Sequence, residues 1–112
     1  MNAIYATYFS GATGNSFAIL VFLNGVVSGA DAGLGRYDGS YAIKEGKIVG
    51  SLVFTLPPHA SSITGISTEN TPLHLDLTIS LALPLEAEPF HQIETPLGPI
   101  NARFEKLRDL DA

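Results

Sequence analysis

The chain contains no cysteine, and it has few charged side chains for its length. Without cysteine, disulfide bonds, zinc–thiolate sites and a thiol nucleophile are excluded together. Only 15% of the 112 residues are charged, with six Lys and Arg against eleven Asp and Glu, which gives a formal net charge of −5. Because a negative chain is repelled by the phosphate backbone of nucleic acids, we expect no direct contact with DNA or RNA.

Long apolar runs are also absent, since no stretch approaches the roughly 18 consecutive apolar residues of a membrane-spanning helix. The N-terminal segment lacks a basic leader before an apolar run. We therefore expect a cytoplasmic protein that does not enter a membrane. Hydrophobic residues nevertheless make up 46% of the chain, so residues 1–112 are expected to form a single domain with its own core.

The apolar residues fall into short segments that are typical of β-strands. Five strands are expected in the first half of the chain, at residues 3–9, 16–23, 26–31, 36–44 and 47–56. The second of these ends at Asn24-Gly25, which is the strongest short-range signal for a hairpin because both central residues of a type I′ turn need positive φ. Glu45-Gly46 is expected to close a second hairpin.

The second half of the chain is less regular. A pair of prolines ends the first array because proline has no amide hydrogen to donate, so residues 57–71 are expected to form a long loop or an irregular strand. Apolar and polar residues then alternate over 73–83, which predicts a strand with one buried face. Further prolines confine any strand near 87–94 to a short or edge position. Residues 100–107 match both a strand and a helical stripe, and strand is preferred.

These hairpins follow one another without intervening helices, which predicts an all-β fold built as an antiparallel meander. About eight strands of this length use nearly the whole chain and suit a small closed or nearly closed β-barrel, which also hides the sheet edges. The many large apolar side chains favour a filled interior. A barrel that holds one small apolar ligand is the alternative.

Residues 29–41, GADAGLGRYDGSY, look more like a binding site than any other stretch. A dinucleotide-binding motif requires G-x-G-x-x-G between a strand and a helix, but here the third glycine, Gly39, is one position late and a strand follows. We therefore interpret the segment as a bent connection in which Gly29 and Gly33 supply backbone freedom and Gly39 relieves crowding. Any binding role is expected at the barrel rim, around Asp31, Arg36 and Asp38.

No pattern of catalytic residues stands out, and the G-x-S-x-G nucleophile elbow is absent. His74 and Asp76 share one strand face at a spacing that could bind a metal together with His59 or His91. Alternation along the strand already accounts for both as members of an exposed polar face. We therefore expect no enzyme activity, no metal site and no cofactor.

The strand expected at 16–23 is apolar on both of its faces, with Phe17 and Ile19 on one and Leu20 and Phe22 on the other. Exposing Leu20 and Phe22 would leave about 200 Å² of apolar surface in water. A homodimer or partner interface is therefore predicted at these two residues. The alternative is that the C-terminal segment covers this face within the monomer.

Several short motifs follow one another in a recognisable order. They are Ile4-Tyr5 with Phe9, the Asn24-Gly25 hairpin, Gly29-Ala30-Asp31, and Tyr37-Asp38-Gly39-Ser40-Tyr41. In this order they resemble the GrlR-like family, which is named for a negative regulator of type III secretion gene expression. The likeness covers roughly the first half of the chain in its motifs, and the remainder only in its strand pattern.

The resemblance implies a lipocalin-like β-barrel that forms a homodimer and has no enzymatic role. The family's namesake binds and restrains a transcriptional activator by protein–protein contact, without contacting DNA itself. In that protein a run of acidic residues after the fourth strand is tied to activator binding, whereas the matching loop here is Lys44-Glu45-Gly46-Lys47. Because two lysines and one acid do not reproduce that charge, the activator is not transferred as a partner.

The function expected from the sequence is therefore that of a non-enzymatic binding or regulatory protein with an unidentified protein partner. The alternative function is that of a carrier for a small apolar ligand inside the barrel.

Overall fold

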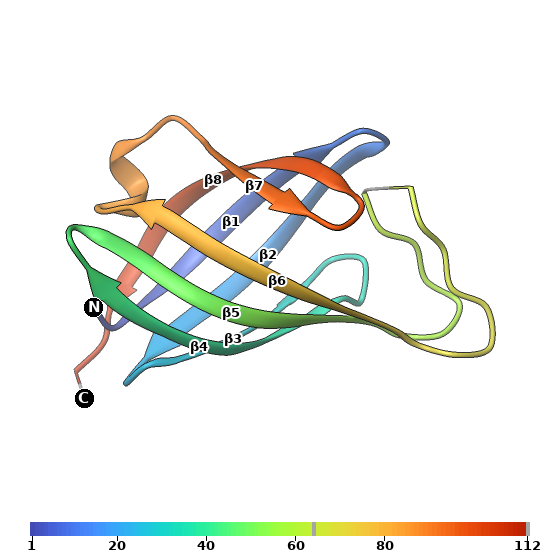
Figure 1. Cartoon of the computed structure of the whole chain (residues 1–112), viewed down its shortest axis with the longest axis horizontal. Coiled ribbons are helices and arrows are strands. Elements are labelled where there is room, and N and C mark those ends of the chain that lie inside the picture. The colour runs from blue at the N-terminus through green and yellow to red at the C-terminus, as the bar shows by residue number, and fades with distance from the viewer. Residues whose placement is uncertain (64, 112) are drawn as a thin grey trace.

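The computed structural model describes residues 1–63 and 65–111, and in these the backbone forms eight antiparallel strands (Figure 1). The strands are β1 (Ala3–Gly11), β2 (Gly14–Leu23), β3 (Val26–Asp31), β4 (Arg36–Lys44), β5 (Lys47–Leu56), β6 (Leu73–Ala82), β7 (His91–Thr95) and β8 (Gly98–Asp109). One turn of 3-10 helix, η1 (Leu85–Ala87), lies between β6 and β7. The predicted all-β fold is confirmed, and the C-terminal segment is a strand.

Each of the first five strands pairs with the next, β8 returns to pair with β1, and β7 pairs with β8, giving the order β6-β5-β4-β3-β2-β1-β8-β7. The end strands β6 and β7 approach each other, so the sheet curls into a nearly closed barrel (Figure 1). The short β7 lies at one end of this order, as the neighbouring prolines predict.

Two tight turns set the register of β2 with β3 and of β4 with β5. Asn24 and Gly25 have φ values of 50° and 82°, and Glu45 and Gly46 have φ values of 52° and 76°. Positive φ at both central residues defines the type I′ turn, whose twist matches that of the flanking strands. Both hairpins predicted from the sequence are therefore confirmed.

Alternation along each strand divides inward from outward side chains. In β6 the leucines and Ile79 face the interior, while His74 and Asp76 are exposed on the outer face, as predicted. At the centre of the core, the Tyr5 ring meets Phe22 and Phe104 edge-on, with 5.8 Å between ring centroids in each case. Such edge-to-face pairs add to the burial of the rings themselves.

The predicted interface at Leu20 and Phe22 is wrong, because these side chains are only 5% and 2% exposed and belong to the core. The outer face of β2 instead carries Phe17 and Ile19, which are 38% and 37% exposed. A strand that is apolar on both faces does not reveal which one is inside. The alternative is that the C-terminal segment covers Leu20 and Phe22 within the monomer. It is partly right, because both residues share one core with Phe104 of the C-terminal strand. However, β8 lies beside β1 and does not cover β2.

The two ends of the barrel differ. One end holds both termini, the β4–β5 turn and η1, whose Leu85 is completely buried (Figure 1). The ring nitrogen Nε2 of His91 lies 2.9 Å from the carbonyl oxygen of Leu85 and ties η1 to β7. The other end carries the β1–β2, β3–β4 and β7–β8 turns and the segment 57–72. Within the described part of the chain, no helix is long and apolar enough to span a membrane.

Candidate ligand-binding cavity at the open end of the barrel

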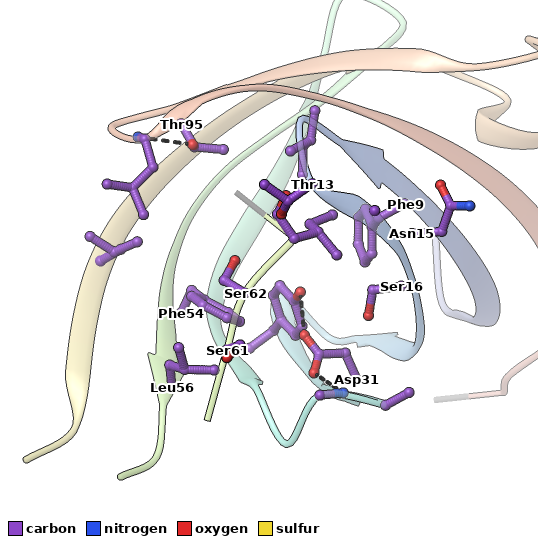
Figure 2. A pocket seen from close by; sticks show the side chains of 18 of the residues that line it. Phe9, Thr13, Asn15, Ser16, Asp31, Phe54, Leu56, Ser61, Ser62 and Thr95 are labelled. Carbon is purple, nitrogen blue, oxygen red and sulfur yellow. Dashed lines mark hydrogen bonds between the residues drawn. The ribbon is translucent and has the colours of Figure 1, made fainter. Parts of the chain in front are cut away.

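A cavity of about 460 Å³ lies at the end of the barrel opposite η1 (Figure 2). Its wall is made mainly of inward-facing apolar side chains from five strands, the β7–β8 turn and the segment 57–72. These side chains are Phe9, Tyr37, Phe54, Leu56, Ile63, Leu75, Leu77, Leu97 and Ile100. The expectation of a filled interior is therefore correct for the half of the barrel near η1 and wrong for this half.

Three aromatic rings form a continuous part of the wall. The Phe9 and Tyr37 rings stack with centroids 6.0 Å apart, and the Tyr37 and Phe54 rings lie 5.1 Å apart at a tilt. Each ring sits at an inward position of its strand, because β1, β4 and β5 alternate their side chains between the two faces. Small side chains such as Ser16 leave the space that these rings border (Figure 2).

Asp31, at the end of β3, supplies the one charged side chain among the described residues that line the cavity. Its Oδ1 accepts hydrogen bonds from the backbone amides of Gly33 at 3.0 Å and Gly35 at 2.7 Å. Its Oδ2 accepts a hydrogen bond from the Tyr37 hydroxyl at 2.9 Å. Aspartate favours such turns because its short carboxylate reaches amides two to four residues further on.

The turn that holds Asp31 depends on close packing and on one unusual backbone conformation. A Cβ on Gly35 would lie 2.4 Å from Cε1 of Phe54 and 2.6 Å from Oδ2 of Asp31, so any larger residue would displace these two side chains. The positive φ of this turn, 71°, belongs to Leu34 and not to Gly33. The interpretation of Gly33 as the flexible point of the bend is therefore wrong.

Crowding, and not bending, also accounts for Gly29 and Gly39. A Cβ on Gly29 would lie 2.3 Å from the carbonyl oxygen of Ile19, and one on Gly39 would lie 2.1 Å from that of Ser51. The prediction that Gly39 relieves crowding is confirmed. Gly29 is expected from the sequence to supply backbone freedom, but the structure shows that it too relieves crowding between strands.

Burial is the main reason why the pKa of Tyr37 is raised well above its ordinary value, and the adjacent Asp31 carboxylate adds to the effect. Ionising the phenol would place a second negative charge next to Asp31 in a poorly solvated place. Tyr37 therefore remains a neutral hydrogen-bond donor, and it holds the Asp31 carboxylate in one orientation at the cavity wall.

The segment 57–72 crosses the opening and is joined to the β1–β2 turn. The backbone amide and the hydroxyl of Thr13 both donate to the carbonyl oxygen of Ile63, at 3.1 Å and 2.6 Å. Within the segment, Ser61 and Ser67 form an isolated β-bridge. The prediction of a loop or irregular strand here is confirmed, and this segment supplies part of the cavity wall.

A second polar cluster lies away from the cavity, at the end of the barrel that holds η1 and both termini, which we call the closed end. The Tyr5 hydroxyl is 3.3 Å from Oε1 of Glu86, and Nζ of Lys106 is 3.4 Å from Oε2 of Glu86 and 3.1 Å from Oδ1 of Asp109. Burial, followed by the charge of Glu86, raises the pKa of Tyr5 to about 12. The pKa of Glu86 is lowered, first by a hydrogen bond from its own backbone and then by Lys106. This cluster fastens η1 to β1 and β8.

The structure separates the residues predicted for the barrel rim. Asp31 lines the cavity, whereas Arg36 and Asp38 are exposed outward-facing residues of β4 and do not line it. Tyr37 and Phe54 are wall residues that the sequence reasoning missed. Alternation in β4 and β5 could have identified them as inward-facing, but not as bordering a cavity.

The other predicted positions lie elsewhere. The loop Lys44-Glu45-Gly46-Lys47 is the β4–β5 turn at the closed end, and the backbone amide of Leu83 donates to the carbonyl oxygen of Gly46 at 2.9 Å. His74 lies on the outer face of the sheet while His91 is buried, so the two histidines do not converge. Residues 1–63 and 65–111 contain no group of three or more His, Asp or Glu side chains placed to hold a metal ion.

Comparison of the chain with protein-family models, with curated proteins and with solved structures gives no significant match. The resemblance to the GrlR-like family therefore stays a prediction.

Proposed function

We propose that this chain is a non-enzymatic binding protein that takes one small, mostly apolar molecule into the cavity at the open end of its barrel. The observation that carries this proposal is the cavity itself, since about 460 Å³ falls within the range of ~300–1,000 Å³ typical of small-molecule sites. Its wall is largely apolar, and the polar side chains on it, Asp31 among them, can orient a ligand.

The cavity volume sets the size of the ligand. A water molecule occupies about 30 Å³ in the liquid, so this space corresponds to roughly fifteen atoms other than hydrogen. A molecule of that size is smaller than a dinucleotide and comparable to a short alkyl chain or a substituted aromatic ring. Part of the wall around the molecule comes from the segment 57–72, which is joined to the β1–β2 turn through Thr13.

Blocking the cavity tests this proposal. Ser16 lines the cavity and pairs with Phe9 on the neighbouring strand, so the substitution Ser16→Leu would fill part of the space. Ser28→Leu makes the same chemical change at an exposed position of β3 and serves as the matched control. Binding is measured by the fluorescence of an environment-sensitive apolar dye and by native mass spectrometry of the purified protein.

We expect the wild type and Ser28→Leu to bind the dye with equal affinity, and Ser16→Leu to bind it at least tenfold more weakly. Equal binding by all three proteins would place the dye outside the cavity and contradict the proposal. Thermal unfolding of each variant provides the check that the barrel is intact.

We further propose that the protein forms a homodimer through the outer face of β1–β3, which the resemblance to the GrlR-like family also implies. Support comes from four outward side chains, Tyr8, Phe17, Ile19 and Val26, which are 46%, 38%, 37% and 52% exposed. The rings of Tyr8 and Phe17 touch across β1 and β2, with centroids 5.2 Å apart. Exposed apolar side chains gathered on one face of a sheet mark interaction surfaces in soluble proteins.

Light scattering after size-exclusion chromatography tests the dimer. We expect twice the chain mass for the wild type at micromolar concentration and a monomer for Phe17→Ser combined with Ile19→Ser. Val53→Ser, at an exposed apolar position of β5, should leave the dimer intact. A monomeric wild type would contradict the proposal.

The remaining part of the proposal concerns regulation. As the resemblance implies, we propose that the protein acts in the cytoplasm by contact with another protein and not by contact with nucleic acid. The net charge of −5 supports the second half of this statement. Affinity capture from the native cell, repeated with the Phe17→Ser and Ile19→Ser variant, should retain a specific protein with the wild type alone. Equal capture of that protein by the wild type and by the double variant would show that the outer face of β1–β3 does not bind it.

A further inference from the structure

The cavity combines a carboxylate with aromatic rings, and this combination defines the chemistry of its ligand. Asp31 is the one charged side chain on the wall among the described residues, and no ion pair joins it to any cationic side chain of the described chain. An uncompensated charge beside apolar surface is most stable when a partner of opposite charge approaches it.

The Asp31 carboxylate has room for one more donor. An ionised carboxylate offers about four lone-pair positions. Two protein amides occupy those of Oδ1, and the Tyr37 hydroxyl occupies one of Oδ2. One acceptor position on Oδ2 is left for a donor that the ligand brings.

The aromatic part of the wall favours the same kind of group. The Tyr37 ring contacts both Phe9 and Phe54, and its hydroxyl donates to Asp31. Phe9, Phe54 and Asp31 all line the same cavity (Figure 2). The face of an aromatic ring attracts a cation, whereas a carboxylate on the ligand would be repelled by Asp31. The two features therefore select the same charge.

We propose that the ligand is a cationic amphiphile of small size, with an ammonium group directed at Oδ2 of Asp31 and an apolar body among the leucines and aromatic rings of the cavity. This inference rests on the proposed function, because it names the chemical class of the molecule that the cavity binds. It excludes fatty acids and other anionic apolar molecules as the preferred ligands.

Three probes with the same apolar body test the inference, namely octylamine, octanol and octanoate. Alkylamines titrate near the ordinary lysine pKa of about 10.4, so octylamine is a cation at pH 7 while octanoate is an anion. Dissociation constants are measured by isothermal titration calorimetry, with saturation-transfer NMR for the weaker probes. We expect the wild type to bind octylamine most tightly, octanol more weakly and octanoate most weakly.

The substitution Asp31→Asn separates charge from structure. The amide oxygen can still accept from Gly33 and Gly35, and its NH₂ group can donate to the Tyr37 oxygen, so the turn keeps its hydrogen bonds. A hydrogen bond to a charged group contributes enough for a change of about tenfold or more in affinity. We expect octylamine to bind Asp31→Asn about tenfold more weakly, and the affinity for octanol to stay within about twofold.

Asp38→Asn is the matched control, because it removes the same charge from the exposed outer face of β4. It should leave all three affinities unchanged. Tyr37→Phe provides a second test that does not depend on the stability of Asp31→Asn. Loss of the phenol frees an acceptor position on Oδ2, so the preference for octylamine over octanol should persist or increase.

The outcomes distinguish this inference from the proposed function. If octanol binds the cavity but octylamine shows no preference, or if Asp31→Asn and Asp38→Asn behave alike, the ligand class is wrong while the binding function stands. If none of the three probes binds the wild type, the proposed function fails and this inference fails with it. A selective loss of octylamine binding in Asp31→Asn supports both.

Discussion

Gly39 is the position where the structure predicts the largest effect from the smallest substitution. It lies in β4 opposite Leu52 of β5. In Gly39→Ala the new Cβ would lie 2.1 Å from the carbonyl oxygen of Ser51, 2.7 Å from Cα of Leu52 and 2.9 Å from the carbonyl carbon of Ser51. All three are backbone atoms, so no side-chain rotation relieves the overlap and β4 must move away from β5.

The expected cost follows from two opposing effects. Overpacking of a well-packed interior costs about 1–3 kcal/mol, and the value should lie at the upper end here because backbone must move. Replacing glycine by alanine also restricts the unfolded chain, which stabilises the fold by about 0.4–1 kcal/mol. We therefore expect Gly39→Ala to lower the free energy of unfolding by about 2–3 kcal/mol. Since small domains have about 5–15 kcal/mol of stability, the variant should still fold.

Gly33→Ala is the control from the same glycine-rich segment. Its Cβ would lie 3.3 Å from the carbonyl oxygen of Ser61 and 3.5 Å from Oδ1 of Asp31, and its φ lies outside the left-handed region. We expect a change within about 1 kcal/mol. Urea denaturation followed by far-ultraviolet circular dichroism measures both variants. Equal losses, or a loss below about 0.5 kcal/mol for Gly39→Ala, would refute the reasoning from close strand contact.

Three further predictions concern other parts of the barrel. Because the pKa of Tyr5 is raised to about 12, the folded state retains a proton that the unfolded chain loses near pH 10. The stability that this proton contributes should be complete below pH 10 and lost as pH rises to 12. Urea denaturation of the wild type and of Tyr5→Phe across this pH range should show a loss of about 1–2 kcal/mol in the wild type alone, once solvent screening is allowed for. Thr13→Val removes the hydroxyl that donates to Ile63, so amides of the segment that crosses the opening should exchange faster by hydrogen-exchange mass spectrometry, while global stability falls by about 1 kcal/mol at most. Phe22→Ala should lower the free energy of unfolding by about 3–5 kcal/mol and Phe17→Ala by less than about 1 kcal/mol, and the reverse order would contradict the assignment of the two faces of β2.

The fold could be predicted from the sequence because its signals are local. Asn24-Gly25 and Glu45-Gly46 both form two-residue turns with positive φ, and strict alternation over 73–82 places one face of β6 inside. Each of these signals involves residues that are neighbours in the chain, so no knowledge of distant contacts is needed.

The orientation of β2 could not be predicted in this way, because both of its faces are apolar. Leu20 and Phe22 face inward since they fit among core rings from other strands, including Tyr5 and Phe104. Such contacts join residues far apart in sequence. Pattern alone therefore gives the strand but not the side that it buries.

The cavity could not be predicted from the sequence for a related reason. Leu75, Leu77 and Phe54 have the same pattern as core residues, and they border empty space only because short side chains such as Ser16 face them across the barrel. Whether opposite walls meet depends on the closure of the whole sheet and on where residues 57–72 return. A single strand carries no signal for either.

The segment 29–41 is important for this cavity in a way that its glycines alone do not indicate. Gly29 and Gly39 allow neighbouring backbones to approach within distances that a Cβ would forbid, and Gly35 lets the turn pack against Phe54 and Asp31. The glycines therefore do not hold a phosphate, as glycine-rich loops before helices do. Two of them, Gly33 and Gly35, donate their backbone amides to the Asp31 carboxylate, which the Tyr37 hydroxyl also holds. Since those donors are all neutral, the charge of Asp31 remains uncompensated, and a cationic ligand is the partner that this arrangement favours.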